Sequence, residues 1–414
     1  MPNLRGDKLP AGDIRLSNYL DNNNEDVRIT GLKIGQTVIV DVPLDGEYRY
    51  PDQPAKAPWV SPDGSREGVH TALFTVAKSN GFAVVFDGRS ELTRSRGRGL
   101  SIANCESFEI YHAYVRGART AGIALQECER FTLHRPTTVN TSNYQTERVD
   151  VNQWNVSGSI KLDRCHDYRL VNPISLEHMG NGITATQCSK GHWLNPFTYA
   201  VHGANQYINA SPEHTVYRGL AVGGTSSNRP PAFVINSEQE NEGASEAFAF
   251  EECYCIDTSW GLGVWGNESK DEIPIQRGSL INSILISQNG NKFHRDTPIT
   301  DFDDSGTLDL LQAKKRKNGE IVGETLTGFT DDEAAFHLGL LRYEATTLAE
   351  MVRNHAESAA IDAKLLNVYG VFESLRRPVA PSPIDREVLT QLLDQGDQIS
   401  AVLAEWLTQV RKLV

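Results

Sequence analysis

Two histidines and an arginine recur at nearly the same distance after three cysteines. His178 lies 13 residues after its cysteine, His202 lies 14 residues after its own, and Arg119 also lies 14 residues after a cysteine. If the cysteines mark equivalent positions of a repeat, stacking of the repeats brings these side chains into one column. A base beside a fixed cation is what proton abstraction next to a carboxylate needs, so all three are candidate catalytic residues.

Charged residues of both signs lie between these positions. Lys161 and Asp163 are separated by one residue, which places both on the same face of a strand, and Glu177 directly precedes His178. We expect Lys161 or His178 to act as the base, and Arg119 to bind a carboxylate. Asp163 or Glu177 would be the acid partner. Such acids could equally supply the carboxylate pair used in acid-assisted hydrolysis.

Further side chains are placed to contact a substrate. Gln126, Tyr207 and Asn209 occupy outward strand positions equivalent to the Lys-x-Asp pair. A long insert carries Asp150, which could join the acids, and Trp154, whose indole could stack on a substrate ring. The insert would then form one side of a cleft.

A separate acidic segment carries part of a calcium-loop spacing. Asp301, Asp303 and Asp309 belong to a run that begins Asp-x-Asp-x-Ser-Gly, but Gln312 stands at the twelfth position, where such a loop has Glu. The segment is therefore either a calcium site or an acidic turn. No other cofactor is required, since no phosphate loop, dinucleotide fingerprint or Cys-x-x-Cys pair occurs in the sequence.

The elements that must position these residues follow a repeat of about 23 residues. The series is marked by Cys105, Cys128, Cys165 and Cys188. Their spacings are 23, 37 and 23 residues, so the middle interval holds one repeat plus a 14-residue insert. An apolar-x-apolar pair precedes each cysteine, and an aromatic side chain follows it. The frame continues with Ser211 in the cysteine position and returns between Phe248 and Cys253.

Alternating apolar residues over three or four positions predict short strands with one buried face. Strands in such strict phase predict a coil whose turns stack about 4.8 Å apart, with aliphatic, aromatic and cysteine stacks inside. The cysteines are then small buried hydrophobes rather than metal ligands or disulfides. The expected fold class is an all-β solenoid with parallel strands over residues 76–290.

The run Gly-Ile-x-Leu-x-x-Cys-x-x-Phe-x-Leu from Gly122 to Leu133 resembles the repeat of pectate-lyase-like right-handed parallel β-helix proteins. That superfamily includes polysaccharide lyases, glycosidases, sugar epimerases and phage tailspikes. The resemblance implies sugar binding along the outer face of the Ile-x-Leu strands. The run Ser211–His214 departs from the Asp-Pro-His motif of alginate epimerases, and no Asn-Thr-Asp or Gly-His-Gly run of the polygalacturonase type occurs.

The resemblance implies a carbohydrate-active enzyme that cleaves a polysaccharide or oligosaccharide by lyase or hydrolase chemistry. One alternative is a tailspike-like or other glycan-binding structural protein. A second alternative is a sugar epimerase or isomerase, which would use the same cleft but release no new chain ends.

The two ends of the chain leave the repeat. Residues 1–75 are expected to cap the open end of the β-helix, and residues 291–329 to form an irregular connection with a hairpin turn at Asn318-Gly319. Residues 330–414 have a helical pattern that begins with a capping box, Thr330–Glu333. Apolar spacings of three and four from Leu389 to Leu413 predict a heptad stripe, which would serve either a homotrimer or packing against the β-helix.

The overall charge excludes two broad classes of partner. The net charge is −13, which argues against general binding to nucleic acid or to an anionic membrane. No apolar run of 18 residues is present, so no transmembrane helix is expected. The first residues lack the apolar core of a signal peptide, which leaves a cytoplasmic location, another export route or a trimmed chain.

Overall fold

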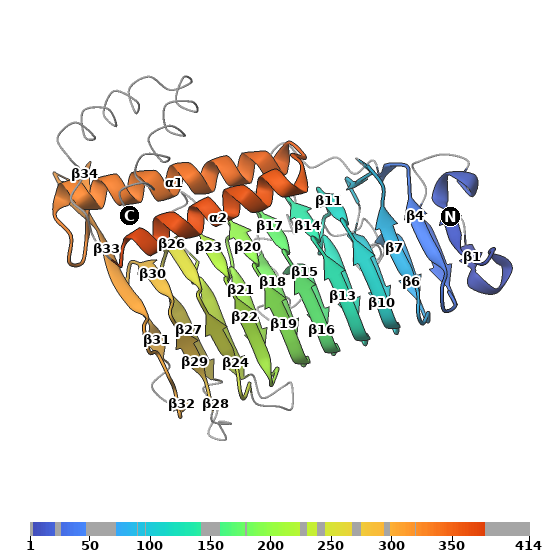
Figure 1. Ribbon diagram of the computed structural model, residues 1–414, viewed down its shortest axis with the longest axis horizontal. Coiled ribbons are helices and arrows are strands. Elements are labelled where there is room, and N and C mark those ends of the chain that lie inside the picture. Colours follow the sequence, from blue (N-terminus) through green and yellow to red (C-terminus); the bar gives the residue numbers. More distant parts are fainter. Residues whose placement is uncertain are drawn as a thin grey trace, which may run out of the picture.

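Successive turns of the chain add one strand to each of three sheets (Figure 1). The structure is a computed structural model that describes residues 3–20, 26–46, 72–88, 90–95, 97–141, 158–178, 180–223, 230–237, 245–266, 275–293, 299–318 and 320–376. Strands of the three sheets stack in parallel, each on its equivalent in the next turn. The chain is therefore a parallel β-helix, as the repeat predicts.

Sheet A contains the Ile-x-Leu strands, and sheets B and C follow it in each turn. Sheet A consists of β1 (Asn3–Arg5), β3 (Val27–Thr30), β6 (Ala72–Ala77), β9 (Arg98–Ala103), β12 (Ile123–Gln126), β15 (Gly158–Asp163), β18 (Asn181–Thr186), β21 (Gln206–Asn209), β24 (Phe233–Ser237), β27 (Leu262–Gly266) and β31 (Lys292–Phe293). Sheet B consists of β2 (Asp13–Arg15), β4 (Thr37–Val40), β7 (Ala83–Phe86), β10 (Glu106–Tyr111), β13 (Glu129–His134), β16 (His166–Val171), β19 (Ser189–Leu194), β22 (His214–Tyr217), β25 (Ala249–Glu251) and β29 (Ser279–Ile281). Sheet C consists of β5 (Leu44–Asp45), β8 (Leu92–Thr93), β11 (Tyr114–Arg116), β14 (Thr137–Val139), β17 (Ile174–Leu176), β20 (Phe197–Tyr199), β23 (Leu220–Val222), β26 (Tyr254–Thr258), β30 (Ile284–Ser287), β33 (Leu308–Lys317) and β34 (Glu320–Leu326). A small pair, β28 (Ile275–Gln276) with β32 (Ile299–Thr300), and two short 3₁₀ turns, η1 (Gly6–Lys8) and η2 (Leu16–Asn18), complete the strand region.

The interior stacks are those that the repeat predicts. Phe108 pairs in register with Phe131, and Phe131 with Tyr168. Their ring centroids are 4.9 and 5.2 Å apart, with nearly parallel planes. All six cysteines are free and buried, which confirms that they serve as small core residues.

Hydroxyl groups continue the cysteine column beyond Cys188. The Cys188 N–H donates to Ser211 Oγ over 2.9 Å, and the Ser211 N–H donates to Ser245 Oγ over 3.1 Å. The expectation for Ser211 is confirmed, but the expectation for Cys253 is wrong. Cys253 follows a sheet B strand instead of preceding one, so it lies at the corner between sheets B and C, where its C=O accepts from Ile284 N–H.

The β-helix extends past both limits that the repeat indicates. β1 and β3 stack on β6 in sheet A, so residues 3–46 already form turns of the coil. At the other end β33 stacks on β30, and then pairs antiparallel with β34 in the hairpin expected around Asn318. The sequence repeat is not visible in these end turns. The coil continues there because short strands without a cysteine can still stack by backbone hydrogen bonding.

Two helices cover the outer face of sheet C, α1 (Asp331–Arg353) and α2 (Ser358–Ser374) (Figure 1). The predicted capping box at Thr330 and Glu333 is present. Outward residues of sheet C such as Ile174, Leu176 and Phe197 are apolar and pack with the helices in one buried cluster. Within the described residues, neither helix is apolar enough over its length to cross a membrane. The heptad stripe from Leu389 to Leu413 lies outside the described residues.

Candidate functional site

The outer face of sheet A carries two columns of side chains, and each column contains the residues at one strand position in successive turns. One column contains Ser101, Ala124, Lys161, Thr184 and Tyr207. The other contains Ala103, Gln126, Asp163, Thr186, Asn209 and Asn236. The strand register therefore confirms the alignment of the Ile-x-Leu strands. It also brings five predicted residues, Lys161, Asp163, Gln126, Tyr207 and Asn209, to one face.

Lys161 and Asp163 form the charged centre of this face. Burial lowers the pKa of Lys161, and the Asp163 carboxylate opposes that effect while the Arg98 guanidinium reinforces it. Burial also lowers the pKa of Arg98, again opposed by Asp163. A lysine whose amine loses its proton more readily than usual is better suited to act as a base.

Arg98 is a cation whose charge interacts with the Asp163 carboxylate. Asp163 also lies 3.4 Å from Arg164, but Arg164 is shared with Glu127, from which it lies 2.8 Å away. Arg98 is not among the residues that the repeat pattern predicts for the site. Its place two residues before the apolar Leu100 would have put it at the start of a sheet A strand.

Polar residues extend the face toward later turns. The Asn236 side-chain amide donates to the Tyr207 hydroxyl over 2.7 Å, and Asn209 is fully buried beside them. Asn236 was missed at the sequence level, although it follows Phe233 and Ile235 in the repeat frame. Because Asn209 and Asn236 are both buried, the predicted contact of Asn209 with a substrate is wrong. Gln126 and Tyr207 are partly exposed, and their polar groups are of the kind that binds sugar hydroxyls.

His178 and His202 lie on adjacent turns, but the side chain of His178 points into the coil and that of His202 points to its surface. The His202 N–H donates to the His178 C=O over 2.9 Å, so the alignment of the turns is right. His178 is nevertheless fully buried, while His202 is exposed. The reason is the difference between 13 and 14 residues after the cysteine, because one residue of offset reverses the direction of a side chain. A surface base role for His178 is therefore wrong.

The buried ring of His178 stabilises the corner of the coil. Its Nδ1 accepts from the Thr141 N–H over 3.1 Å, and burial lowers its pKa to about 3. His214 is also fully buried, 2.5 Å from the Tyr168 hydroxyl, with its pKa lowered to about 3 by burial. Both histidines are neutral members of the core.

These two histidines should make the fold sensitive to acid. Between pH 6.5 and 3 the unfolded chain binds a proton at each site that the folded chain does not, so stability falls as pH falls through that window. Going from pH 7 to pH 5 should cost on the order of 2 kcal/mol per histidine. Urea unfolding at both pH values measures it.

The variants His178→Gln and His214→Gln should each reduce this pH dependence, whatever they do to stability at pH 7. The matched change His202→Gln, at an exposed site, should leave it unaltered. An unchanged pH dependence in both core variants would contradict the assignment.

Two other predicted residues lie away from the Lys161 centre. Glu177 forms an ion pair of 2.5 Å with Arg353 at the end of α1, so it belongs to the contact between sheet C and the helix. It directly follows β17 of sheet C, so it lies at the edge of the sheet that the helices cover. Arg119 is only 3% exposed, which removes it from the surface where a substrate would bind. The proposed roles of both residues at the cleft are therefore wrong.

The remaining predicted residues belong to the long insert and to the acidic segment around Asp301. Asp150 and Trp154 lie outside the described residues. Within the described chain, no group of three or more His, Cys, Asp or Glu side chains could hold a metal ion. Asp303 instead accepts from the Ser305 N–H over 2.9 Å, and Asp309 accepts from the Asn291 N–H over 3.2 Å. The acidic segment around Asp301 thus forms the loop that leads into β33, in the last turn of the coil.

Comparison with known proteins shows likeness of fold alone. No protein-family model matches the chain, and no curated protein matches it. Among solved structures, the periplasmic alginate epimerase AlgG is similar over 74% of this chain and 76% of its own, with 10% identity and a TM-score of 0.42. An exopolygalacturonase from Thermotoga maritima is similar over 78% and 86%, with 7% identity and a TM-score of 0.43. The Streptococcus pneumoniae surface adhesin PfbA is similar over 68% and 83%, with 6% identity and a TM-score of 0.36.

Proposed function

We propose that this chain is a carbohydrate-active β-helix enzyme that removes the C5 proton of a uronate residue in an acidic polysaccharide or oligosaccharide. The observation that carries the proposal is the half-buried Lys161 amine with its lowered pKa, held beside Asp163 and within the field of Arg98. The amine is the base, and Arg98 is the group that binds the sugar carboxylate. Gln126 lies in the same column as Asp163, is partly exposed, and would bind a neighbouring hydroxyl.

The reaction needs these residues, the substrate and water, which supplies the proton taken up by the leaving oxygen in a lyase or by C5 in an epimerase. Lys161 Nζ takes the C5 proton, and the electron pair of the C–H bond is stabilised as the enolate of the carboxylate bound to Arg98. In a lyase that electron pair then forms a C4–C5 double bond while the C4–O bond breaks, and the leaving oxygen takes up a proton. In an epimerase a proton returns to C5 from the opposite side, and no bond of the chain is broken.

Proton abstraction is favoured here over glycoside hydrolysis. Hydrolysis needs two carboxyl groups about 5–10 Å apart across the scissile bond. In the part of sheet A that the structure describes, Asp163 is the only acidic residue on a strand. Glu177, the other described candidate, is engaged by Arg353 at α1.

A panel of substrates tests the proposal. The full chain is incubated with oligogalacturonate, oligomannuronate and oligoguluronate, and with neutral glucans as a control. Ultraviolet absorbance detects the unsaturated product of a lyase, and proton exchange at C5 in deuterated water detects an epimerase. We expect one of these two signals from at least one uronate. Reducing ends without unsaturation would indicate hydrolysis and overturn the mechanism, and no product from any uronate would overturn the function.

A further inference from the structure

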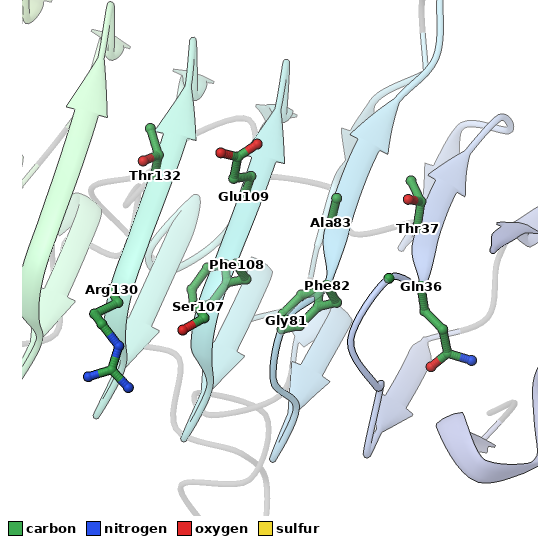
Figure 2. Close-up of a pocket in the computed structure, with 11 residues that line it drawn as sticks. Gln36, Thr37, Gly81, Phe82, Ala83, Ser107, Phe108, Glu109, Arg130 and Thr132 are labelled. Carbon is green, nitrogen blue, oxygen red and sulfur yellow. The ribbon is translucent and has the colours of Figure 1, made fainter. Parts of the chain in front are cut away.

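A second polar hollow lies on the outer face of sheet B, around its N-terminal turns. It has a volume of about 450 Å³, within the usual range of small-ligand sites. Its lining comes from β4, β7, β10 and β13 and from the residues that lead into them (Figure 2). In Figure 2, Glu109 and Ser107 lie on one strand, β10, and Arg130 lies on the neighbouring strand, β13. Sheet A and its Lys161 centre lie on another face of the coil.

The hollow exists because small residues occupy these turns. The outward column through its centre runs from Thr37 through Ala83 and Glu109 to Thr132. In the next two turns the same column carries Arg169 and His192, both exposed and much larger. Gly35, Gly81 and Ser107 leave further space beside Ala83, so the first turns are recessed where the later ones are filled.

The groups around the hollow are suited to sugar hydroxyls. Glu109 is an exposed carboxylate that accepts from the Tyr111 hydroxyl, which leaves oxygen lone pairs for a ligand. Arg130 adds guanidinium donors, and Ser107 and Thr132 add hydroxyls that both donate and accept. A carboxylate and a guanidinium on neighbouring strands can bind neighbouring hydroxyl groups of one sugar, one as acceptor and the other as donor.

The local charge excludes an acidic sugar. Arg130 is paired with Glu106 and lies 3.3 Å from Glu129, so with Glu109 there are three carboxylates for one guanidinium. A uronate would meet this excess of negative charge and be repelled. The surroundings of Lys161 have the opposite character, with Arg98 and Lys161 facing Asp163.

We propose that this hollow is a binding subsite for a neutral saccharide, separate from the sheet A site and of opposite charge preference. It holds the sugar through Glu109, Arg130 and the hydroxyls of Ser107 and Thr132. The inference does not depend on the proposed reaction, since no residue of the hollow belongs to sheet A.

Titration calorimetry with the full chain tests the subsite. The probes are maltotriose, cellotriose and mannotriose, with trigalacturonate as the acidic counterpart. Ala83→Leu should fill the hollow and weaken binding of the neutral probe at least tenfold. Ala249→Leu is the matched control, because Ala249 lies in the same outward column beyond the hollow and is similarly half-exposed. Glu109→Gln should also weaken binding, by about tenfold, since it replaces a charged acceptor.

The outcomes separate this subsite from the sheet A site. Binding of a neutral trisaccharide that is lost in Ala83→Leu and kept in Ala249→Leu and Lys161→Gln supports the proposal. No binding of any neutral probe, equal loss in both leucine variants, or loss of trigalacturonate binding in Ala83→Leu overturns it. None of these results bears on whether a uronate is processed at Lys161, which the product assay decides.

Discussion

Replacing Lys161 with glutamine should reduce kcat on the uronate substrate by about 10²–10⁴, the range that a positioned proton-transfer group contributes. The amide keeps the length and polarity of the side chain but cannot take a proton at neutral pH. The fold should be unchanged, because Lys161 lies on the outer face of β15 and its register neighbours Ala124 and Thr184 are small. Steady-state kinetics with circular dichroism of the same sample measures both properties.

The matched control is Lys190→Gln, at an exposed position on sheet B, which should retain full activity.

The charged neighbours of Lys161 provide a second test, which distinguishes a base from a residue that only supports the fold. Arg98→Gln removes a cation that lowers the pKa of Lys161, so that pKa should rise. Asp163→Asn removes an anion that raises it, so the pKa should fall. Carbon NMR of the Lys161 side chain follows both shifts without substrate, and shifts in the same direction would contradict the electrostatic assignment.

Replacing Arg342 with methionine should lower the free energy of unfolding by about 3 kcal/mol, near the lower end of the cost of breaking a buried ion pair. Arg342 of α1 donates to both oxygens of Asp257 in β26 over 2.7 Å, and lies 2.6 Å from Glu324 of β34. Burial opposes its charge, but the hydrogen bonds that it donates to both carboxylates raise its pKa overall. Without the guanidinium, two largely buried carboxylates would face each other.

The effect should be concentrated in the helices. Urea unfolding gives the change in stability, and hydrogen exchange should show faster opening of α1 than of the sheet A strands. Arg342→Lys should lose part of the stability, because lysine keeps the charge but not the two-pronged geometry. The matched surface change is Arg277→Met, whose pair with Glu246 is exposed and should contribute about 0–1 kcal/mol. Equal losses in the two methionine variants would contradict the assignment.

The repeat frame could be read without a structure because stacking forces equivalent residues into contact. Every apolar position in the cysteine frame lies inside, and the aromatic column of Phe108, Phe131 and Tyr168 is continuous. The same frame placed Lys161 and Asp163 on one outward face, since side chains on a strand alternate with a period of two. The capping box at Thr330 and the hairpin after β33 were equally local signals.

Positions outside the strands were harder to predict, because corners and loops do not keep the period of two. His178 and His202 are neighbours along the chain of turns, yet one residue of offset buried the first and exposed the second. Glu177 pairs with Arg353, which lies 176 residues later in the sequence, and no local sequence pattern predicts such a contact.

The sequence by itself determined the coil, its period, its core and the face on which Lys161 and Asp163 lie. These follow from short-range periodicity, which stacking of each turn on the next converts directly into structure. Only the tertiary structure decided which charged side chains meet, which histidines are buried, and that α1 and α2 cover sheet C. Those features depend on the direction of single side chains and on contacts between distant segments, and both are decided by packing of the whole chain.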